Sequence, residues 1–232
     1  DRLLQAHVTA DGRVDYAAFA RSADFRDYLE DLSQADIGEL PDGERLALWI
    51  NAYNAYTIAL MNQHQERRSI RNINRRFGLI RGNGPWSEAI ARVGGRTYTL
   101  DEIEHEIIRK RFREPRIHFA LVCAAIGCPP LRREAYTGEQ LDAQLDDQAK
   151  AFLLRSEAKN RVDVAAGVAY LSPIFRWYRE DFGENDRELL AYLSGFFPAG
   201  PERERLQRGN LRIEYTEYDW TLNSQQNDRS DD

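Results

Sequence analysis

The sequence predicts a single α+β domain in which helices surround a small, mostly antiparallel sheet. Helical apolar patterns recur along the chain, two hairpin signals interrupt them, and the regular strand–helix alternation of a doubly wound sheet is absent. The chain has 232 residues, of which 42% are hydrophobic, so it is long enough to bury a core. We expect the domain to cover residues 1–223 and a polar, disordered tail to cover residues 224–232.

The longest predicted helix runs from about Glu44 to Gln65, after a Leu-Pro-Asp-Gly break. Its central part is apolar nearly all the way round, which is typical of a buried helix. Asn51 and Asn54 fall on the same side as several of its apolar residues. A buried amide without hydrogen bonds costs about 1–3 kcal/mol. Both amides are therefore expected either to fix the backbone of a neighbouring loop or to line a substrate site.

The remaining elements follow from caps, turns and periodicity. Capping boxes at 99–102 and 137–140 predict two helix starts, and Gly94-Gly95 and the Ala-Ala-Gly at 165–167 predict two hairpin turns. A basic stretch at 67–84 is expected to be a loop, or a weak helix followed by a loop. The predicted helices are 16–19, 23–32, 99–112, 137–154, 173–178 and 187–197, and the predicted strands are 90–93, 96–99, 117–123, 161–164, 168–171 and 211–216.

Charge and composition exclude several classes of partner. The net charge is −6, and the basic and acidic residues are mixed along the chain without a basic tract, which argues against a nucleic-acid partner. No apolar run approaches the roughly 18–20 residues that span a bilayer. Two cysteines do not make a disulfide framework. The expected partner is a small molecule or a peptide, with no cofactor.

The stretch 117–131 holds the candidate chemistry, because an apolar strand there leads into a turn containing glycine. Alternation along the strand places His118 on one face and Cys123, an expected core residue, on the other. Cys128 lies between Gly127 and Pro129, where its sulfur is expected to be exposed. Such a thiol becomes a nucleophile when a base or a positive charge favours the thiolate.

Glu104 falls in the middle of the apolar face of the predicted helix 99–112. A buried carboxylate needs partners, because otherwise it becomes neutral. One interpretation is a structural ion pair with an arginine such as Arg116 or Arg132. The other is a role in acid–base chemistry beside His105, because perturbed titratable groups gather at functional sites.

Two further arrangements use the same atoms. Cys123, Cys128, His105 and His118 would make a Cys₂His₂ metal site, but their spacing matches no familiar zinc module, so we expect no metal. The two cysteines would instead form a disulfide if the protein is exported.

Four ordered motifs resemble those of domain-of-unknown-function family 547. The likeness extends from about Asp11 to Asn223 and rests on Trp-Ile-Asn-Ala-Tyr-Asn-Ala at 49–55, Ile-Glu-His at 103–105, His-Phe-Ala-Leu-Val-Cys at 118–123 with Gly-Cys-Pro at 127–129, and Tyr-Asp-Trp at 218–220. Bacterial members are commonly exported, so the resemblance implies a mature extracytoplasmic form, periplasmic or secreted. Plant proteins that begin with a leucine zipper end in a similar domain. Those relatives match Glu104 and His105 but not His118 or Cys128.

Two functional hypotheses follow. The first is a cysteine-dependent hydrolase or acyl/peptidyl transferase, with Cys128 as nucleophile, His105 or else His118 as base, and Glu104 orienting that base; Asn51 and Asn54 would bind the substrate or an oxyanion. The second is an extracytoplasmic binding domain without catalysis. In that case the aromatic residues around Phe175, Trp177, Tyr178 and Trp220 would form the ligand surface.

Overall fold

A computed structural model describes residues 1–74 and 84–226, and it has the α+β fold that the sequence predicts. The α-helices in these residues are α1 (Arg2–His7), α2 (Tyr16–Arg21), α3 (Ala23–Gln34), α4 (Asp42–Gln63), α5 (Arg109–Phe112), α6 (Leu141–Leu154), α7 (Ile174–Trp177), α8 (Arg179–Phe182), α9 (Asp186–Ser194) and α10 (Pro201–Arg208). Short 3₁₀-helices cover Ile70–Asn72, Pro85–Ser87 and Pro115–Phe119, and a π-helix covers Glu102–Ile108. None of the described helices is long and apolar enough to cross a membrane.

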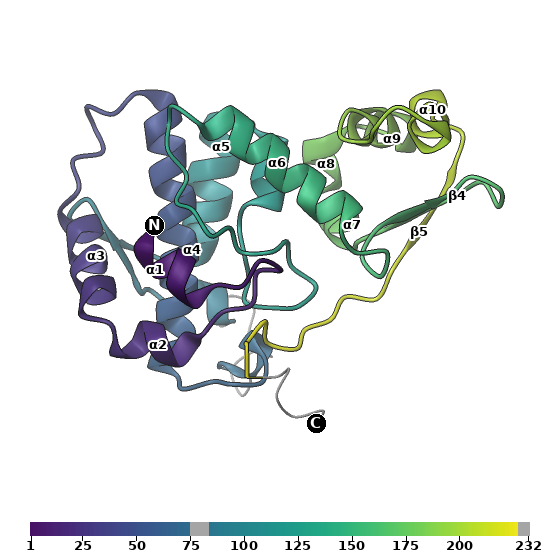
Figure 1. The fold of residues 1–232 in the computed structure, drawn as a ribbon. Helices are drawn as coiled ribbons and strands as arrows, with labels where there is room; N and C mark the ends of the chain where they lie inside the picture. Colours follow the sequence, from purple (N-terminus) through teal and green to yellow (C-terminus); the bar gives the residue numbers. More distant parts are fainter. Residues whose placement is uncertain (75–83, 227–232) are drawn as a thin grey trace.

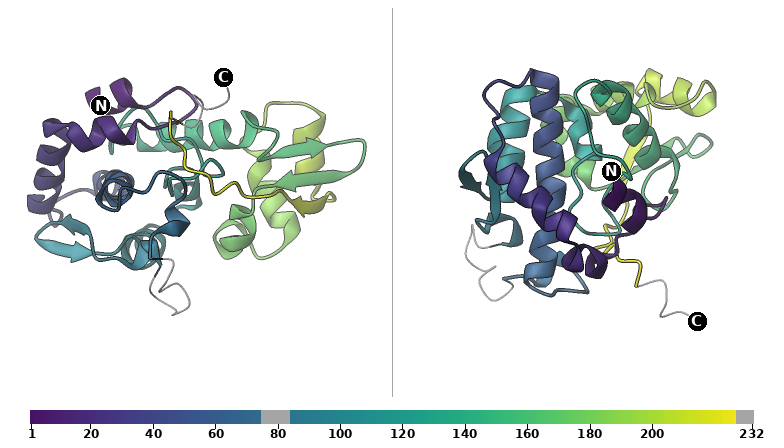
Figure 2. Two further views of the ribbon diagram at one scale, coloured as in Figure 1. Left: turned by 90° about the horizontal axis from the view of Figure 1, so that it is seen from below. Right: turned by 60° about the vertical axis from the view of Figure 1, so that its left-hand side comes forward.

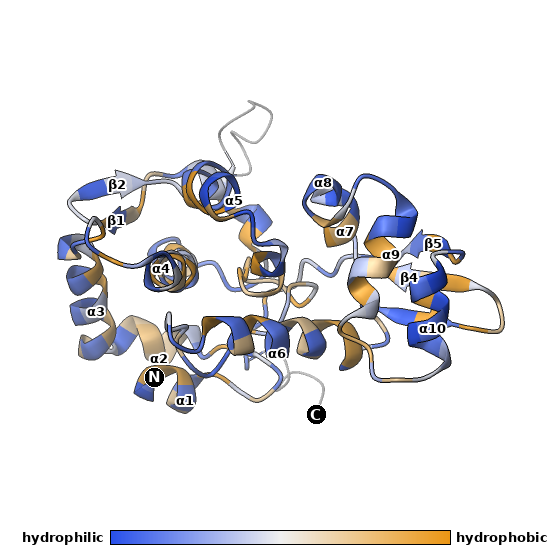
Figure 3. Ribbon diagram, turned by 90° about the horizontal axis from the view of Figure 1, so that it is seen from above, coloured by the Kyte–Doolittle hydropathy of each residue, from blue (hydrophilic) through white to orange (hydrophobic). Residues whose placement is uncertain are grey.

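The helix α4 is the centre of the larger part of the molecule. Viewed end-on in Figure 3, it lies among α2, α3, α6 and the β1–β2 hairpin. Its apolar residues are buried on nearly every side, which confirms the buried helix predicted from the sequence. The π-helix Glu102–Ile108 packs directly against it.

The strands form two separate small sheets. One is the antiparallel hairpin of β1 (Ala91–Val93) and β2 (Arg96–Tyr98), joined at Gly94-Gly95 as predicted. The other has the order β3-β4-β5, in which β3 (Arg161–Asp163) and β4 (Val168–Leu171) form the second predicted hairpin. Strand β5 (Arg212–Tyr215) lies parallel to β4. Parallel strands need a long crossover, and helices α7 to α10 occupy it.

The buried residues form two clusters that helix α6 connects. The first surrounds α4, and the second is rich in phenylalanine and lies beneath α7 to α10 and β4, on the right of Figure 1. Leu141 and Leu145 at the start of α6 pack in the first cluster, whereas Phe152 and Leu153 near its end pack in the second.

The last described segment returns from the second cluster to the first. Figures 1 and 2 show this yellow segment running from β5 back towards α1 and α2. Leu222 forms a β-bridge with Ala125, and Ser224 forms one with Val14. Ser224 is only 2% exposed, so the predicted tail begins later than residue 224; residues 227–232 lie outside the described part.

Several local predictions were wrong. The expected strand 117–123 is instead the 3₁₀-helix Pro115–Phe119 followed by irregular chain, because the Asn54 side chain binds the backbone there in place of a neighbouring strand. The capping box at Thr99 forms both of its bonds, whereas Thr137 does not cap α6, which begins at Leu141. The 3₁₀-helix Ile70–Asn72 is consistent with the loop or weak helix expected in the stretch 67–84, of which residues 75–83 lie outside the described residues.

Candidate functional site

A cavity of about 200 Å³ lies between the two clusters, and we call it the aromatic pocket. Residues of both clusters line it, including Tyr53 of α4 and Ile174 of α7. Its aromatic lining is Tyr53, Trp86, Trp177, Tyr178, Tyr218 and Trp220, and its other polar lining is Asp101, Glu104, His105, His118 and Cys123. The pocket therefore brings together Glu104, His105 and His118, three of the residues predicted from the sequence.

The aromatic rings contact one another around Trp220. Its ring centroid lies 4.6 Å from that of Tyr218 and 6.0 Å from that of Trp86, and Trp177 stacks on it at 5.8 Å. The guanidinium of Arg71 lies over the same ring, 5.2 Å from its centroid. Trp177 remains 44% exposed. The aromatic wall thus reaches the surface, and one of its rings already attracts a cation.

Glu104 is the buried carboxylate of the pocket, with 7% of its surface exposed. It lies on the π-helix and accepts hydrogen bonds from the hydroxyl groups of Tyr53 and Tyr178. Burial, followed by the nearby Glu104 charge, raises the pKa of both tyrosines well above its usual value. The same two causes raise the pKa of Tyr218. These phenols therefore keep their protons and act as hydrogen-bond donors.

The expected ion pair of Glu104 with Arg116 or Arg132 does not form. Arg116 binds Glu114, Asp142 and Asp146, and Arg132 binds Glu134 and Asp147. Within residues 1–74 and 84–226, no lysine or arginine forms an ion pair with Glu104. The carboxylate is satisfied by hydrogen bonds but is not matched by an opposite charge.

Both histidines of the pocket are held by charged partners. His118 Nε2 lies 2.6 Å from Asp181 Oδ2, and the His118 ring stacks on Tyr178 at 4.0 Å. Arg109 donates to both oxygens of Asp181, at 2.6 and 2.9 Å, and to His105 Nδ1 at 3.1 Å. Because a guanidinium can only donate, His105 Nδ1 accepts, and a neutral His105 carries its proton on Nε2.

Asp181 contrasts with Glu104, because the Arg109 guanidinium forms an ion pair with it. Burial alone would raise its pKa, but hydrogen bonds from His118 and Arg109 hold the pKa well below the ordinary aspartate value. In the sequence, Asp181 lies 63 residues after His118 and belongs to no recognisable motif. Only the fold brings the two together, so sequence reasoning missed this pair.

The two cysteines form a disulfide, with their Cα atoms 6.2 Å apart. Neither therefore carries a free thiol in this structure. Their environments are the reverse of those expected: Cys128 is 1% exposed, whereas Cys123 is partly exposed and lines the aromatic pocket. The turn buries Cys128 because Tyr218 and Asp219 pack closely over Gly127. Among the described residues no group of three or more His, Cys, Asp or Glu side chains is placed to hold a metal ion.

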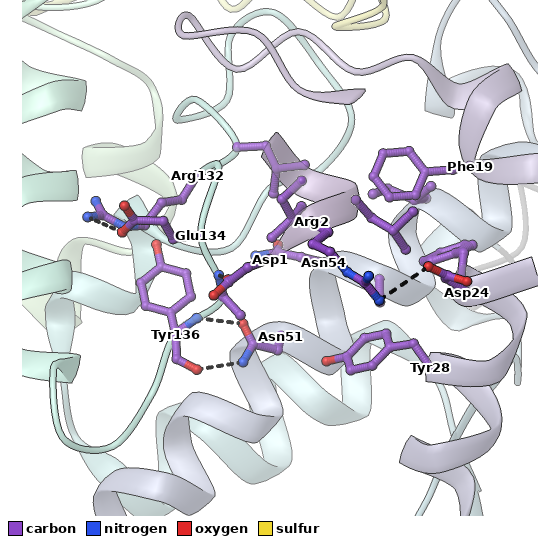
Figure 4. Close-up of a pocket in the computed structure, with 17 residues that line it drawn as sticks. Asp1, Arg2, Phe19, Asp24, Tyr28, Asn51, Asn54, Arg132, Glu134 and Tyr136 are labelled. Carbon is purple, nitrogen blue, oxygen red and sulfur yellow. Dashed lines mark hydrogen bonds and ion pairs between the residues drawn. The ribbon is translucent and has the colours of Figure 1, made fainter. Parts of the chain in front are cut away.

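Asn51 and Asn54 line a different cavity, of about 240 Å³, beneath α1 and beside α3 (Figure 4). Asn51 exchanges two hydrogen bonds with the backbone of Tyr136, at 2.8 and 2.9 Å. Asn54 donates to the Ala120 carbonyl at 3.0 Å and accepts from the Val122 N–H at 2.9 Å. Both amides fix the backbone of a neighbouring segment, and the structure does not bring them to the aromatic pocket.

The chain was compared with known proteins. The sequence profile of a family described as "Protein of unknown function, DUF547" matches residues 37–153, which is half of the chain. No curated protein and no solved structure matches it. The matched region supplies α4, the π-helix and the disulfide, whereas Trp177, Tyr178, Tyr218 and Trp220 lie beyond it.

Proposed function

This chain belongs to the DUF547 family, whose description names no activity, and from the aromatic pocket we propose that it is a binding domain for small organic cations. The ligand class is an amine or a quaternary ammonium compound. Of the aromatic residues suggested by the sequence, Trp177, Tyr178 and Trp220 line this pocket together with Trp86 and Tyr218, whereas Phe175 is buried in the second cluster.

The observation that carries the proposal is the buried Glu104 carboxylate without a cationic partner. Buried charges in proteins are normally paired, and the hydroxyls of Tyr53 and Tyr178 supply hydrogen bonds but no positive charge. A bound cation would supply it. The surrounding ring faces add an attraction of about 0.5–2 kcal/mol for each cation–π contact.

The size of the pocket favours a compact cation. Its volume of about 200 Å³ is below the range of most drug-sized ligand sites. The exposed Trp177 at the rim leaves room for a substituent to extend into solvent. A small ammonium headgroup on a longer molecule fits both features.

The disulfide supports the extracytoplasmic location that the family resemblance implies. Disulfides form and persist in oxidising compartments and are rare in the cytosol. The Cys123–Cys128 bond therefore favours a periplasmic or secreted protein. A small molecule of that compartment is the partner we propose.

Calorimetric titration tests the proposal. Choline should bind, and its neutral analogue, in which carbon replaces the ammonium nitrogen, should bind about 10-fold more weakly or not at all, because it lacks the charge that pairs with Glu104. Titration with a primary alkylamine tests the other proposed class of ligand, the protonated amines. Equal affinity for the charged and neutral compounds, or no binding of either cation, would contradict the proposal.

Catalysis remains the second candidate, because Glu104, His105 and His118 line the same pocket as Cys123. The sulfur that meets these residues is that of Cys123 rather than that of Cys128, and it becomes a nucleophile only after reduction. We expect any ester hydrolysis by the reduced protein to disappear in Cys123→Ala. Absence of activity in the reduced parent on a panel of activated esters would remove this candidate.

A further inference from the structure

We propose that the Cys123–Cys128 disulfide is redox-active and exchanges with low-molecular-weight thiols that enter the aromatic pocket and attack Cys123. This activity goes beyond ligand binding and does not depend on it. Three features support it: the unequal exposure of the two cysteines, the hydrogen bonds to Cys128, and the size of the pocket.

The two cysteines differ in access. Cys123 is partly exposed and lines the aromatic pocket, whereas only 1% of Cys128 is exposed. Cys128 also borders another cavity, where Lys159 donates to its carbonyl oxygen at 2.7 Å. An external thiolate is therefore expected to meet the sulfur of Cys123 first, and the volume of about 200 Å³ limits it to a small thiol.

Hydrogen bonds prepare Cys128 as the leaving group. Its sulfur accepts from the Cys123 N–H at 3.1 Å, a bond that Cys123 Sγ does not share. The Tyr218 hydroxyl lies within hydrogen-bond distance of both sulfurs, 3.2 Å from Cys128 Sγ and 3.1 Å from Cys123 Sγ, so it is placed to donate to Cys128 Sγ once the disulfide opens. Donors to a sulfur atom favour its thiolate form, and a thiolate with a lower pKa leaves faster in disulfide exchange. Because burial and Glu104 raise the pKa of Tyr218, its hydroxyl keeps the proton that this bond needs.

The reaction balances with two molecules of thiol. The first thiolate bonds to Cys123 Sγ; the Cys123–Cys128 bond breaks, and its electron pair remains on Cys128 as a thiolate. A second thiolate then attacks the external sulfur of the mixed disulfide and releases the Cys123 thiolate. The two small thiols are oxidised to one disulfide, the protein is reduced to a dithiol, and the protons released by the thiols are available to the cysteine thiolates.

Single-cysteine variants test which sulfur is accessible. Cys128→Ser keeps the Cys123 thiol, and Cys123→Ser keeps the Cys128 thiol. Iodoacetamide, an alkylating reagent small enough for the pocket, should label folded Cys128→Ser about 10-fold or more faster than folded Cys123→Ser, because the reaction requires access. In denaturant the two rates should become similar, which controls for intrinsic reactivity. Equal rates in the folded variants, or a faster Cys128, would overturn the proposal.

The parent protein tests the exchange itself. Incubation of the folded protein with a small monothiol, followed by acid quench and mass spectrometry, should trap a mixed disulfide on Cys123. A disulfide that stays intact in the folded protein at a large excess of thiol, and opens only in denaturant, would show a purely structural bond. Circular dichroism under the same conditions confirms that the protein is folded.

Tyr218→Phe tests the positioning role of the hydroxyl. We expect the parent disulfide to open about 10-fold faster than that of the variant, because the variant lacks one donor to the leaving Cys128 thiolate. The reduced variant should also show a higher pKa of Cys128 in an alkylation-rate profile, a readout that a merely structural tyrosine would not move. Tyr215→Phe is the matched control, as Tyr215 lies on β5 outside the pocket. An unchanged rate and profile would remove Tyr218 from the mechanism.

If the disulfide proves inert to thiols, the calorimetric result for choline still stands, because that titration uses the oxidised protein.

Discussion

Two buried polar side chains lie on neighbouring helices, Asn54 on α4 and Glu104 on the π-helix, and they have different kinds of partner. The side-chain amide of Asn54 on α4 forms hydrogen bonds with the backbone of residues 120 and 122. Glu104 of the π-helix accepts hydrogen bonds from the hydroxyls of Tyr53 and Tyr178 and faces a cavity. An amide whose hydrogen bonds are all made to the backbone, like that of Asn54, stabilises the fold. A buried carboxylate without an opposite charge, like that of Glu104, would be paired by a cationic ligand.

The largest expected effect comes from the amide. Asn54→Ala removes two buried hydrogen bonds and leaves the Ala120 carbonyl and the Val122 N–H without their partner. We expect a loss of about 2–4 kcal/mol in the free energy of unfolding. Denaturant titration measures it, and Asn51→Ala, at a more exposed position, should cost less. A loss below that of Asn51→Ala would contradict a structural role for Asn54.

In contrast to Asn54, Glu104 should affect ligand affinity more than stability. Glu104→Gln keeps the size and the hydrogen-bond acceptor but removes the charge, so choline affinity should fall about 10-fold, or about 1.4 kcal/mol. Its free energy of unfolding should change by less than about 1 kcal/mol. Glu106→Gln, on the exposed side of the same π-helix, is the matched control and should bind as the parent does. Equal affinity of Glu104→Gln and the parent would show that Glu104 does not contact the ligand.

Asp181 differs from Glu104, because this carboxylate does have a cationic partner, Arg109. Its lowered pKa means that the ionised form stabilises the fold above the unfolded value of about 3.9, and that this stability is lost as the pH falls further. Asp181→Asn should therefore flatten the stability profile between about pH 4 and pH 2. The difference should be on the order of 1 kcal/mol, since partial exposure screens the pair. Denaturant titrations across this range test it, and parallel profiles for parent and variant would refute it.

At neutral pH the smallest effect is expected at Lys159, a partly buried cation that donates to the Cys128 carbonyl. Burial lowers its pKa to about 8. Because the unfolded chain keeps this proton up to about pH 10.4, stability should rise between pH 8 and pH 10. Lys159→Met should remove that rise and change stability at neutral pH by no more than about 1 kcal/mol. If stability still rises between pH 8 and pH 10 in the variant, a group other than Lys159 causes the rise.

Local signals predicted much of this fold. The apolar pattern of α4, the glycine turn of the first hairpin and the Thr99 capping box each concern residues close in sequence, and each is confirmed. The strand predicted at 117–123 was wrong because periodicity alone cannot distinguish a buried strand from a short buried helical segment. Its true partner is the side chain of Asn54, 66 residues away.

The site was predictable only in part, for the same reason. Glu104 was identified because a carboxylate interrupts an apolar face, and that reasoning depends on one helix. The partners that define its chemistry, Tyr53 and Tyr178, come from distant elements. Which sulfur faces the pocket is also decided by tertiary packing, since Tyr218 covers Gly127 beside Cys128. Sequence thus indicated the unusual residue but not its surroundings.

The return of residues 222–225 to the first cluster has a consequence for biosynthesis. Val14 pairs with Ser224, and the Tyr16 hydroxyl binds Asn223 at 2.5 Å, so contacts that complete the early part of the chain come from residues made about two hundred positions later. Chains fold from the N-terminal side as they emerge. During most of translation Val14 and Tyr16 therefore lack these partners. We expect this part of the nascent chain to be a binding site for chaperones.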